Sequence, residues 1–129
     1  MLAGCSAGEP QPADAPSTTL GARPSSPARL SIRLPRNGQV VKGGTVTLKV
    51  DLEGGRIVNA TTTNIRPDQG HVHVTVDGQL VAMNYNLNGK LPKLQPGAHV
   101  VRVEFVAADH LPFDPRVFTQ AAFQTTESS

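Results

Sequence analysis

Residues 45–52 read TVTLKVDL, a strict alternation of polar and aliphatic side chains. Successive side chains of a β-strand point to opposite faces, so the aliphatic half of this stretch would face a core and the polar half solvent. The same period of two recurs in residues 28–34, 71–78 and 99–107. The strands predicted in this way have the following inward-facing residues: Leu30, Ile32, Leu34, Val46, Leu48, Val50, Leu52, Val72, Val74, Val76, Val101, Val103 and Phe105.

Short turn signals separate the predicted strands. Asn37-Gly38 and Gly43-Gly44 are turn dipeptides, and Asp77-Gly78 lies between two strand-like runs at positions that tolerate a positive φ. A last strand is expected within residues 116–125, whereas residues 59–69 fit no element. About seven short strands with no amphipathic helix between them predict an all-β chain folded as an antiparallel sandwich of two sheets.

Composition divides the chain of 129 residues into segments. Residues 6–28 are rich in Pro, Ala, Ser and Gly and contain one large aliphatic residue, Leu20, so we expect a disordered linker there. Residues 29–125 are expected to form the sandwich domain, and residues 126–129 a disordered tail.

The chain opens with MLAGC, which places its single cysteine at position 5. Leu2-Ala3-Gly4-Cys5 resembles the lipobox of bacterial lipoproteins, in which the peptide is cut before the cysteine and the new terminal cysteine is acylated. This resemblance implies that residues 1–5 are the remnant of a signal peptide and that Cys5 is lipidated. The protein would then be anchored to a membrane in the cell envelope and face its extracytoplasmic side.

Two longer stretches also resemble known proteins. LPRNGQVVKGGTVTLKVDLEG (residues 34–54), with LQPGAHVVRVEF (residues 94–105), is similar to bacterial immunoglobulin-like domains. That resemblance implies an immunoglobulin-like β-sandwich and specifies no activity. GHVHVTVDGQLVAM (residues 70–83), with PGAHVVRVEFVAADH (residues 96–110), resembles uncharacterised envelope lipoproteins and copper-associated proteins that have a G-H-x-H strand.

The histidines form the one chemical constellation in the sequence, because all four lie between positions 71 and 110. On an extended strand His71 and His73 project to one face with Cα atoms ~6.5 to 7 Å apart, a spacing that suits two imidazoles on one metal ion. Candidates for further ligands are His110, Met83, Glu104 and Asp77. A set of His and Met favours copper, and His with carboxylate favours zinc.

The same alternation also supports a structural interpretation of these residues. If Val72 and Val74 face the core, His71 and His73 face outward, as solvent-facing or cross-strand hydrogen-bonding residues, whereas His99 faces inward and does not automatically meet them. His99 is expected to be structural, with its ring bonded to a nearby loop carbonyl. His110 could orient its own loop, and Met83 could be a core residue.

Two functions remain once other chemistry is set aside. The sequence has no nucleophile motif, phosphate-binding glycine loop or carboxylate pair, so an enzyme is not expected. A net charge of +2 with scattered basic residues argues against a nucleic-acid partner. The first hypothesis is a lipid-anchored binding or structural module that contacts an envelope protein or polymer. The alternative is an extracytoplasmic metal-binding protein for copper, or less favourably zinc, that uses His71 and His73 with His110 or Met83.

Overall fold

The structure is a computed structural model that describes residues 22–84 and 86–127. Cys5, the predicted signal-peptide remnant, most of the predicted linker and the last two residues lie outside the described residues. The description of the fold therefore concerns the sandwich domain and the seven residues that precede it.

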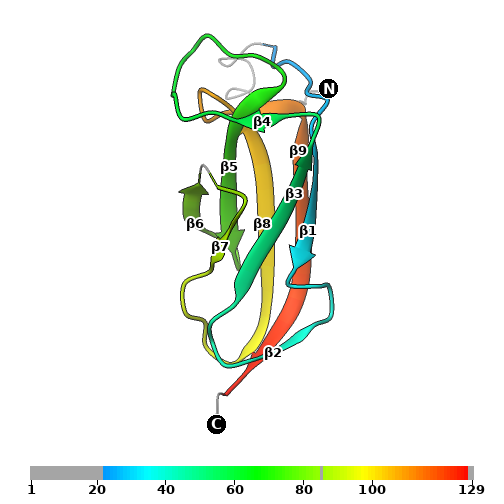
Figure 1. Cartoon of the computed structure of the whole chain (residues 1–129), viewed down its shortest axis with the longest axis vertical. Helices are drawn as coiled ribbons and strands as arrows, with labels where there is room; N and C mark the ends of the chain where they lie inside the picture. The colour runs from blue at the N-terminus through cyan, green and yellow to red at the C-terminus, as the bar shows by residue number, and fades with distance from the viewer. Residues whose placement is uncertain (1–21, 85, 128–129) are drawn as a thin grey trace, which may run out of the picture.

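The described residues form nine strands and no helix (Figure 1). The strands are β1 (Arg29–Leu34), β2 (Val40–Lys42), β3 (Thr47–Glu53), β4 (Arg56–Ile57), β5 (Gln69–Val76), β6 (Gln79–Asn84), β7 (Asn88–Lys90), β8 (Gly97–Ala107) and β9 (Pro112–Thr126). Strands β8 and β9 run along most of the length of the molecule, and the loop between β4 and β5 lies at the same end as the turn between β8 and β9 (Figure 1).

The strands are arranged in two sheets, as the alternation predicts. The smaller sheet has the order β1-β3-β7, and the larger has the order β2-β9-β8-β5-β4 with β6 also paired to β5. All pairings are antiparallel except β2 with β9 and β4 with β5, which are short and parallel. The predicted all-β sandwich is confirmed, and it has nine strands instead of about seven because β2, β4 and β7 are only two or three residues long.

The core lies between the two sheets and is built from the residues that the period-two pattern selects. Val46, Val74 and Phe105 are at most 1% exposed. Phe105, near the end of β8, also stacks on Phe113, at the start of β9, with ring centroids 5.6 Å apart. The predicted turn at Asp77-Gly78 is likewise present, with φ of 52° and 85° at its two residues.

Residues 58–68, which include all but the last residue of the 59–69 stretch that fits no predicted element, form an extended loop over one end of the larger sheet. The backbone amide of Val58 donates to the carbonyl of Gly70 at 3.0 Å, and that of Thr62 donates to the carbonyl of Ala108 at 3.1 Å. These two bonds hold the loop against β5 and against the turn that follows β8. The loop therefore covers the outer face of β5 at its beginning.

The structure departs from the predicted linker at its last residues. Arg23 binds the turn between β8 and β9, the backbone amide of Asp114 donates to the carbonyl of Pro24 at 2.9 Å, and Ala28 is buried in the core. Composition alone places residues 22–28 in a linker because it cannot register single contacts of this kind. Residues 23–28 thus make contacts with the sandwich, and at the other end β9 continues to Thr126.

Candidate functional site

Three of the four histidines meet at the end of the sandwich that the 58–68 loop covers. His71 and His73 come from β5, and His110 comes from the turn between β8 and β9. His73 Nε2 lies 3.1 Å from His110 Nδ1, and the ring centroids of His71 and His110 are 4.3 Å apart. We call His71, His73 and His110 the histidine cluster.

His71 is the innermost member of the cluster. Its side chain projects away from the core, as the alternation predicts, but it is 0% exposed because the 58–68 loop lies over it. The interpretation of His71 as a solvent-facing residue is therefore wrong. Its Nε2 donates to the carbonyl of Ala60 at 3.0 Å, which ties the ring to the 58–68 loop.

The glycine before His71 allows β5 to lie close to β8. A Cβ added at Gly70 would overlap the carbonyl oxygen of Val106 and lie 2.9 Å from its carbonyl carbon. Gly70 is also paired with Ile57 of β4 on its other side. The G-H-x-H pattern thus has a physical basis at its first position, since a side chain there would push the strand that carries His71 and His73 away from β8.

His110 has an unusual backbone conformation for a residue with a side chain. Its φ is 67°, in the left-handed region that costs a non-glycine residue about 1 to 2 kcal/mol. The turn is closed by the amide of His110, which donates to the carbonyl of Ala107 at 2.8 Å. This conformation directs the ring toward β5, where Nδ1 meets His73 and Nε2 lies 3.1 Å from the Thr61 hydroxyl oxygen.

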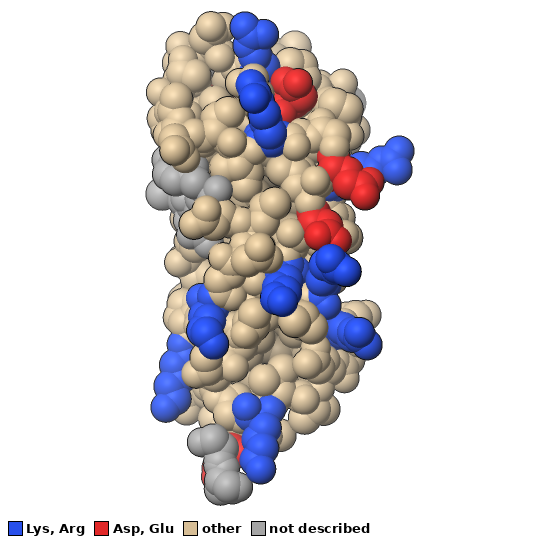
Figure 2. Space-filling model, in the orientation of Figure 1, with Lys and Arg blue, Asp and Glu red and all other residues tan. Residues whose placement is uncertain are grey.

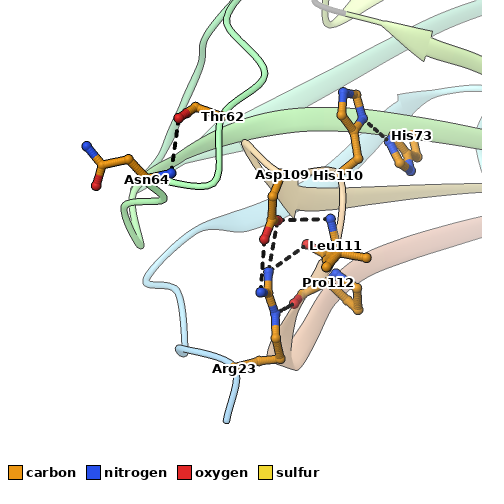
Figure 3. A network of polar contacts seen from close by, with 8 residues as sticks. All are labelled: Arg23, Thr62, Asn64, His73, Asp109, His110, Leu111 and Pro112. Carbon is orange, nitrogen blue, oxygen red and sulfur yellow. Dashed lines mark hydrogen bonds and ion pairs between the residues drawn. The ribbon is translucent and has the colours of Figure 1, made fainter. Parts of the chain in front are cut away.

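The turn that carries His110 is held from the N-terminal side of the domain (Figure 3). The guanidinium of Arg23 donates to both carboxylate oxygens of Asp109, each at 3.0 Å, and to the carbonyl of Pro112 at 2.9 Å. Both partners of this ion pair have side chains that are 14% exposed. The sequence does not point to Arg23 as part of the site, because nothing in a Pro- and Ser-rich stretch signals a bidentate contact.

The spacing of the two facing nitrogens permits two kinds of bond. A hydrogen bond at 3.1 Å needs one of the two rings to carry the proton. A metal ion would use both lone pairs instead, and bonds of ~2.05 Å to nitrogens 3.1 Å apart subtend an angle of about 98°. That angle lies between square-planar and tetrahedral values, so the distance between the two nitrogens fits one shared ion as well as it fits a hydrogen bond.

The cluster is not a closed metal site as it stands. Within residues 22–84 and 86–127, no three His, Cys, Asp or Glu side chains are arranged to hold a metal ion together. His71 uses its Nε2 in the hydrogen bond to the Ala60 carbonyl, and its ring lies 4.3 Å from that of His110. The geometry therefore offers two converging nitrogens, with the third imidazole packed against the second.

Burial and repulsion from neighbouring histidines favour the neutral forms of the two histidines of β5. Burial lowers the pKa of His71 below its ordinary 6.5, and the nearby His110 lowers it further, although hydrogen bonds to the backbone of Ala60 and Val58 act in the opposite direction. Burial also lowers the pKa of His73, with smaller contributions from His110 and His71. Neutral imidazole is the form that binds metal ions.

Of the other predicted ligands, Glu104 and Asp77 are not brought into the cluster as available donors. Glu104 is the register partner of His73, but its carboxylate is bound by Arg116 at 3.1 and 3.2 Å. Met83 is the register partner of His73 on β6, and its side chain lies outside the described part of the structure. Asp77 lies at the far end of β5, four residues from His73 and thus ~13 Å away along the strand.

His99 is separate from the cluster and takes part in a different contact. Its Nδ1 donates to the carboxylate of Asp77 at 2.7 Å and its Nε2 donates to the carbonyl of Gln95 at 2.7 Å. With both ring nitrogens donating, the ring is an imidazolium, and the hydrogen bond to Asp77 raises the pKa of His99 above its ordinary value. The ring also packs 5.7 Å from that of Phe123 on the inner side of β9.

The charged side chains on one face of the molecule are scattered. Figure 2 shows Lys and Arg side chains spread along its length, with acidic side chains between them in the upper part. The part of the chain that the structure describes contains no helix that could cross a membrane.

Comparisons with known proteins place the fold and go no further. No family model matches the chain, and no curated protein matches its sequence. The PKD domain of human KIAA0319 superposes with a TM-score of 0.50 at 10% identity, covering 84% of this chain and 89% of that one. This likeness and the two-sheet topology define an immunoglobulin-like β-sandwich.

Two further solved structures are similar at lower scores. The fibronectin(III)-like modules of Clostridium thermocellum CbhA give a TM-score of 0.47 at 9% identity and cover 78% of this chain and 97% of that chain. CopC from Methylosinus trichosporium OB3b gives a TM-score of 0.43 at 18% identity and covers 79% of this chain and 96% of that chain.

Proposed function

We propose that the protein is a non-enzymatic binding module of the cell envelope, tethered by a lipid on Cys5, whose ligand is a transition-metal ion. His73 and His110 would be the first two ligands, with His71 beside them. The observation that carries this proposal is the approach of His73 Nε2 and His110 Nδ1 to 3.1 Å. Residues separated along the chain by the end of β5 and by strands β6, β7 and β8 are brought together at one point.

The surroundings of the pair also fit a metal centre. A histidine ligand ordinarily uses its second ring nitrogen in a hydrogen bond that fixes the ring orientation. The second nitrogen of His110 has such a contact to the Thr61 hydroxyl, and His71 has one to the carbonyl of Ala60. In addition, the left-handed φ of His110 costs free energy, and backbone strain of this kind is found at functional sites. Here the strained conformation directs the ring of His110 at His73.

Copper is the first choice of metal and zinc the second. Cu²⁺ binds a given set of nitrogen ligands more tightly than Zn²⁺ does, and imidazole suits both ions. Two imidazoles leave further coordination positions for water, for a third ligand of this chain or for a donor from another molecule. An incomplete set of ligands is suited to holding an ion reversibly.

Location in the envelope is supported by the lipobox-like Leu2-Ala3-Gly4-Cys5. An acylated Cys5 would leave residues 6–22 as the connection between the lipid and the first contact of the domain, Arg23. A coil of this length spans on the order of 20 to 25 Å, which would keep the histidine cluster clear of the headgroup layer.

Calorimetric titration with Cu²⁺ and Zn²⁺ tests the proposal. The full chain carries Cys5→Ser so that the thiol cannot bind the metal. It is compared with the same chain carrying His73→Ala and His110→Ala, and with a His99→Ala control that removes a histidine outside the cluster. We expect 1:1 binding at micromolar or lower Kd that weakens at least a hundredfold in the double variant and is unchanged in the control.

The other interpretation is a purely structural or adhesive module in which the cluster is an internal hydrogen-bonded packing element. It predicts no stoichiometric metal binding, or binding that all three proteins share. Either result would remove the metal proposal and leave a module that contacts an envelope protein or polymer through its sheets and loops.

A further inference from the structure

We infer that Arg23 is a positioning residue for His110. Through this contact, metal binding at the histidine cluster depends on whether residues 23–28, the segment before β1, are docked on the sandwich. This inference rests on the proposed function. It starts from the contacts drawn in Figure 3, in which the guanidinium of Arg23 hydrogen-bonds to residues on both sides of His110.

Arg23 binds the residues on either side of His110. On the preceding side, its Nη1 and Nη2 donate to Asp109 Oδ2 and Oδ1, each at 3.0 Å. On the following side, Nη2 donates to the carbonyl of Leu111 at 3.3 Å and Nε donates to that of Pro112 at 2.9 Å. His110 is thus the residue spanned by the fork of Arg23.

Asp109 completes this arrangement within the turn. Its Oδ1 also accepts the backbone amide of Leu111 at 3.1 Å, so the carboxylate bridges over His110 to the residue after it. Arg23 orients that carboxylate and holds the pKa of Asp109 below its ordinary value, against the opposing effect of burial. The bidentate geometry requires a guanidinium, since an ammonium group presents a single point of charge.

The left-handed conformation of His110 is the feature that needs this support. A residue with a side chain at φ of 67° relaxes to negative φ when its neighbours allow it. Such a relaxation would swing the ring away from His73. Holding Asp109 and Leu111 in place therefore keeps His110 Nδ1 at 3.1 Å from His73 Nε2.

The location of Arg23 in the chain gives the contact a further consequence. Arg23 belongs to the segment that joins the domain to the N-terminal region, and Ser26 of the same segment donates to the carbonyl of Pro67 in the 58–68 loop. Docking of this segment thus braces both loops that surround the cluster. By linkage, a metal ion bound between His73 and His110 would in turn favour the docked segment.

The test compares Arg23→Gln and Arg23→Lys with Arg29→Gln, all in the full chain with Cys5→Ser. Arg29 is an exposed arginine six residues further along, on β1, and serves as the matched control. The metal-free readout is the intraresidue amide-to-Hα nuclear Overhauser effect of His110, which is strong at positive φ. The second readout is Cu²⁺ affinity by calorimetry, with the fold monitored by the amide spectrum.

We expect Arg23→Gln to weaken the strong His110 effect and to raise the Kd for Cu²⁺ about tenfold, while Arg29→Gln changes neither. Arg23→Lys should resemble Arg23→Gln, because it keeps the charge without the fork. An unchanged His110 signal in Arg23→Gln would overturn the inference. The inference would also be overturned if the parent protein binds Cu²⁺ and Arg23→Gln binds it with the same affinity.

Failure of the proposed function gives results that differ from failure of the Arg23 inference. If the parent chain itself binds no metal, the proposed function is lost, and the coupling of Arg23 to metal affinity is lost with it. The metal-free signal then still decides whether Arg23 holds the conformation of His110.

Discussion

Replacing Gly70 with alanine should be far more damaging than an alanine substitution at another strand glycine. The new Cβ would overlap the carbonyl oxygen of Val106 and lie 2.9 Å from the carbonyl carbon, whereas carbon atoms in contact ordinarily lie ~3.5 to 4.0 Å apart. Strand β5 would have to move away from β8 locally. Overpacking of this kind costs about 1 to 3 kcal/mol, and two weakened ladder bonds add ~1 kcal/mol each.

The matched control is Gly89→Ala on β7. A Cβ at Gly89 would meet nothing within 4 Å, so stability should be unchanged or higher by up to about 1 kcal/mol. In urea denaturation, with a slope of ~2 kcal/mol per molar, Gly70→Ala should lower the midpoint by about 1.5 to 2.5 M. A midpoint within about 0.3 M of that of Gly89→Ala would refute the close approach of β5 and β8, and with it the basis proposed for the glycine in G-H-x-H.

Two further predictions concern the ion pair of His99 with Asp77, at the other end of β5, and the hydrophobic core. Hydrogen bonding to Asp77 raises the pKa of His99, so the stability that this contact contributes is fully present below pH 6.5, the value for the unfolded chain, and is lost as the pH rises through the folded pKa. Asp77→Asn keeps the turn and removes the charge, so the difference in melting temperature between parent and variant should shrink between about pH 5.5 and 8.5; a constant difference would contradict it. Phe105→Ala should destabilise the domain by about 3 to 5 kcal/mol in chemical denaturation. Phe118→Ala, at a residue that is 46% exposed, should cost less than about 1.5 kcal/mol. Similar losses of stability in the two variants would show that the core is placed wrongly.

The sheets could be predicted from the sequence because the signal is local. Alternation in residues 45–52 selects Val46, Leu48 and Val50, and all three are at most 5% exposed. The hairpin at Asp77-Gly78 follows from two residues that tolerate positive φ. Short strands such as β4 were missed because two residues cannot show a period, and their parallel pairing with a distant strand is set by tertiary structure.

The candidate site was predictable only in part. Spacing indicates that His71 and His73 share a face, but the burial of His71 depends on a loop without periodicity that folds over β5. The approach of His110 depends on a left-handed φ at a residue that is not glycine, which local propensity disfavours. The contribution of Arg23 depends on one side-chain contact made 86 residues away along the chain.

The central claim is that His73 and His110 hold one metal ion between them. It is tested most directly by pulsed electron paramagnetic resonance of the full chain with Cys5→Ser, loaded with one equivalent of Cu²⁺. We expect modulation from at least two equatorial imidazoles, reduced by one in His73→Ala and in His110→Ala and unchanged in His99→Ala. A spectrum without imidazole modulation, or one that neither cluster substitution alters, would contradict it.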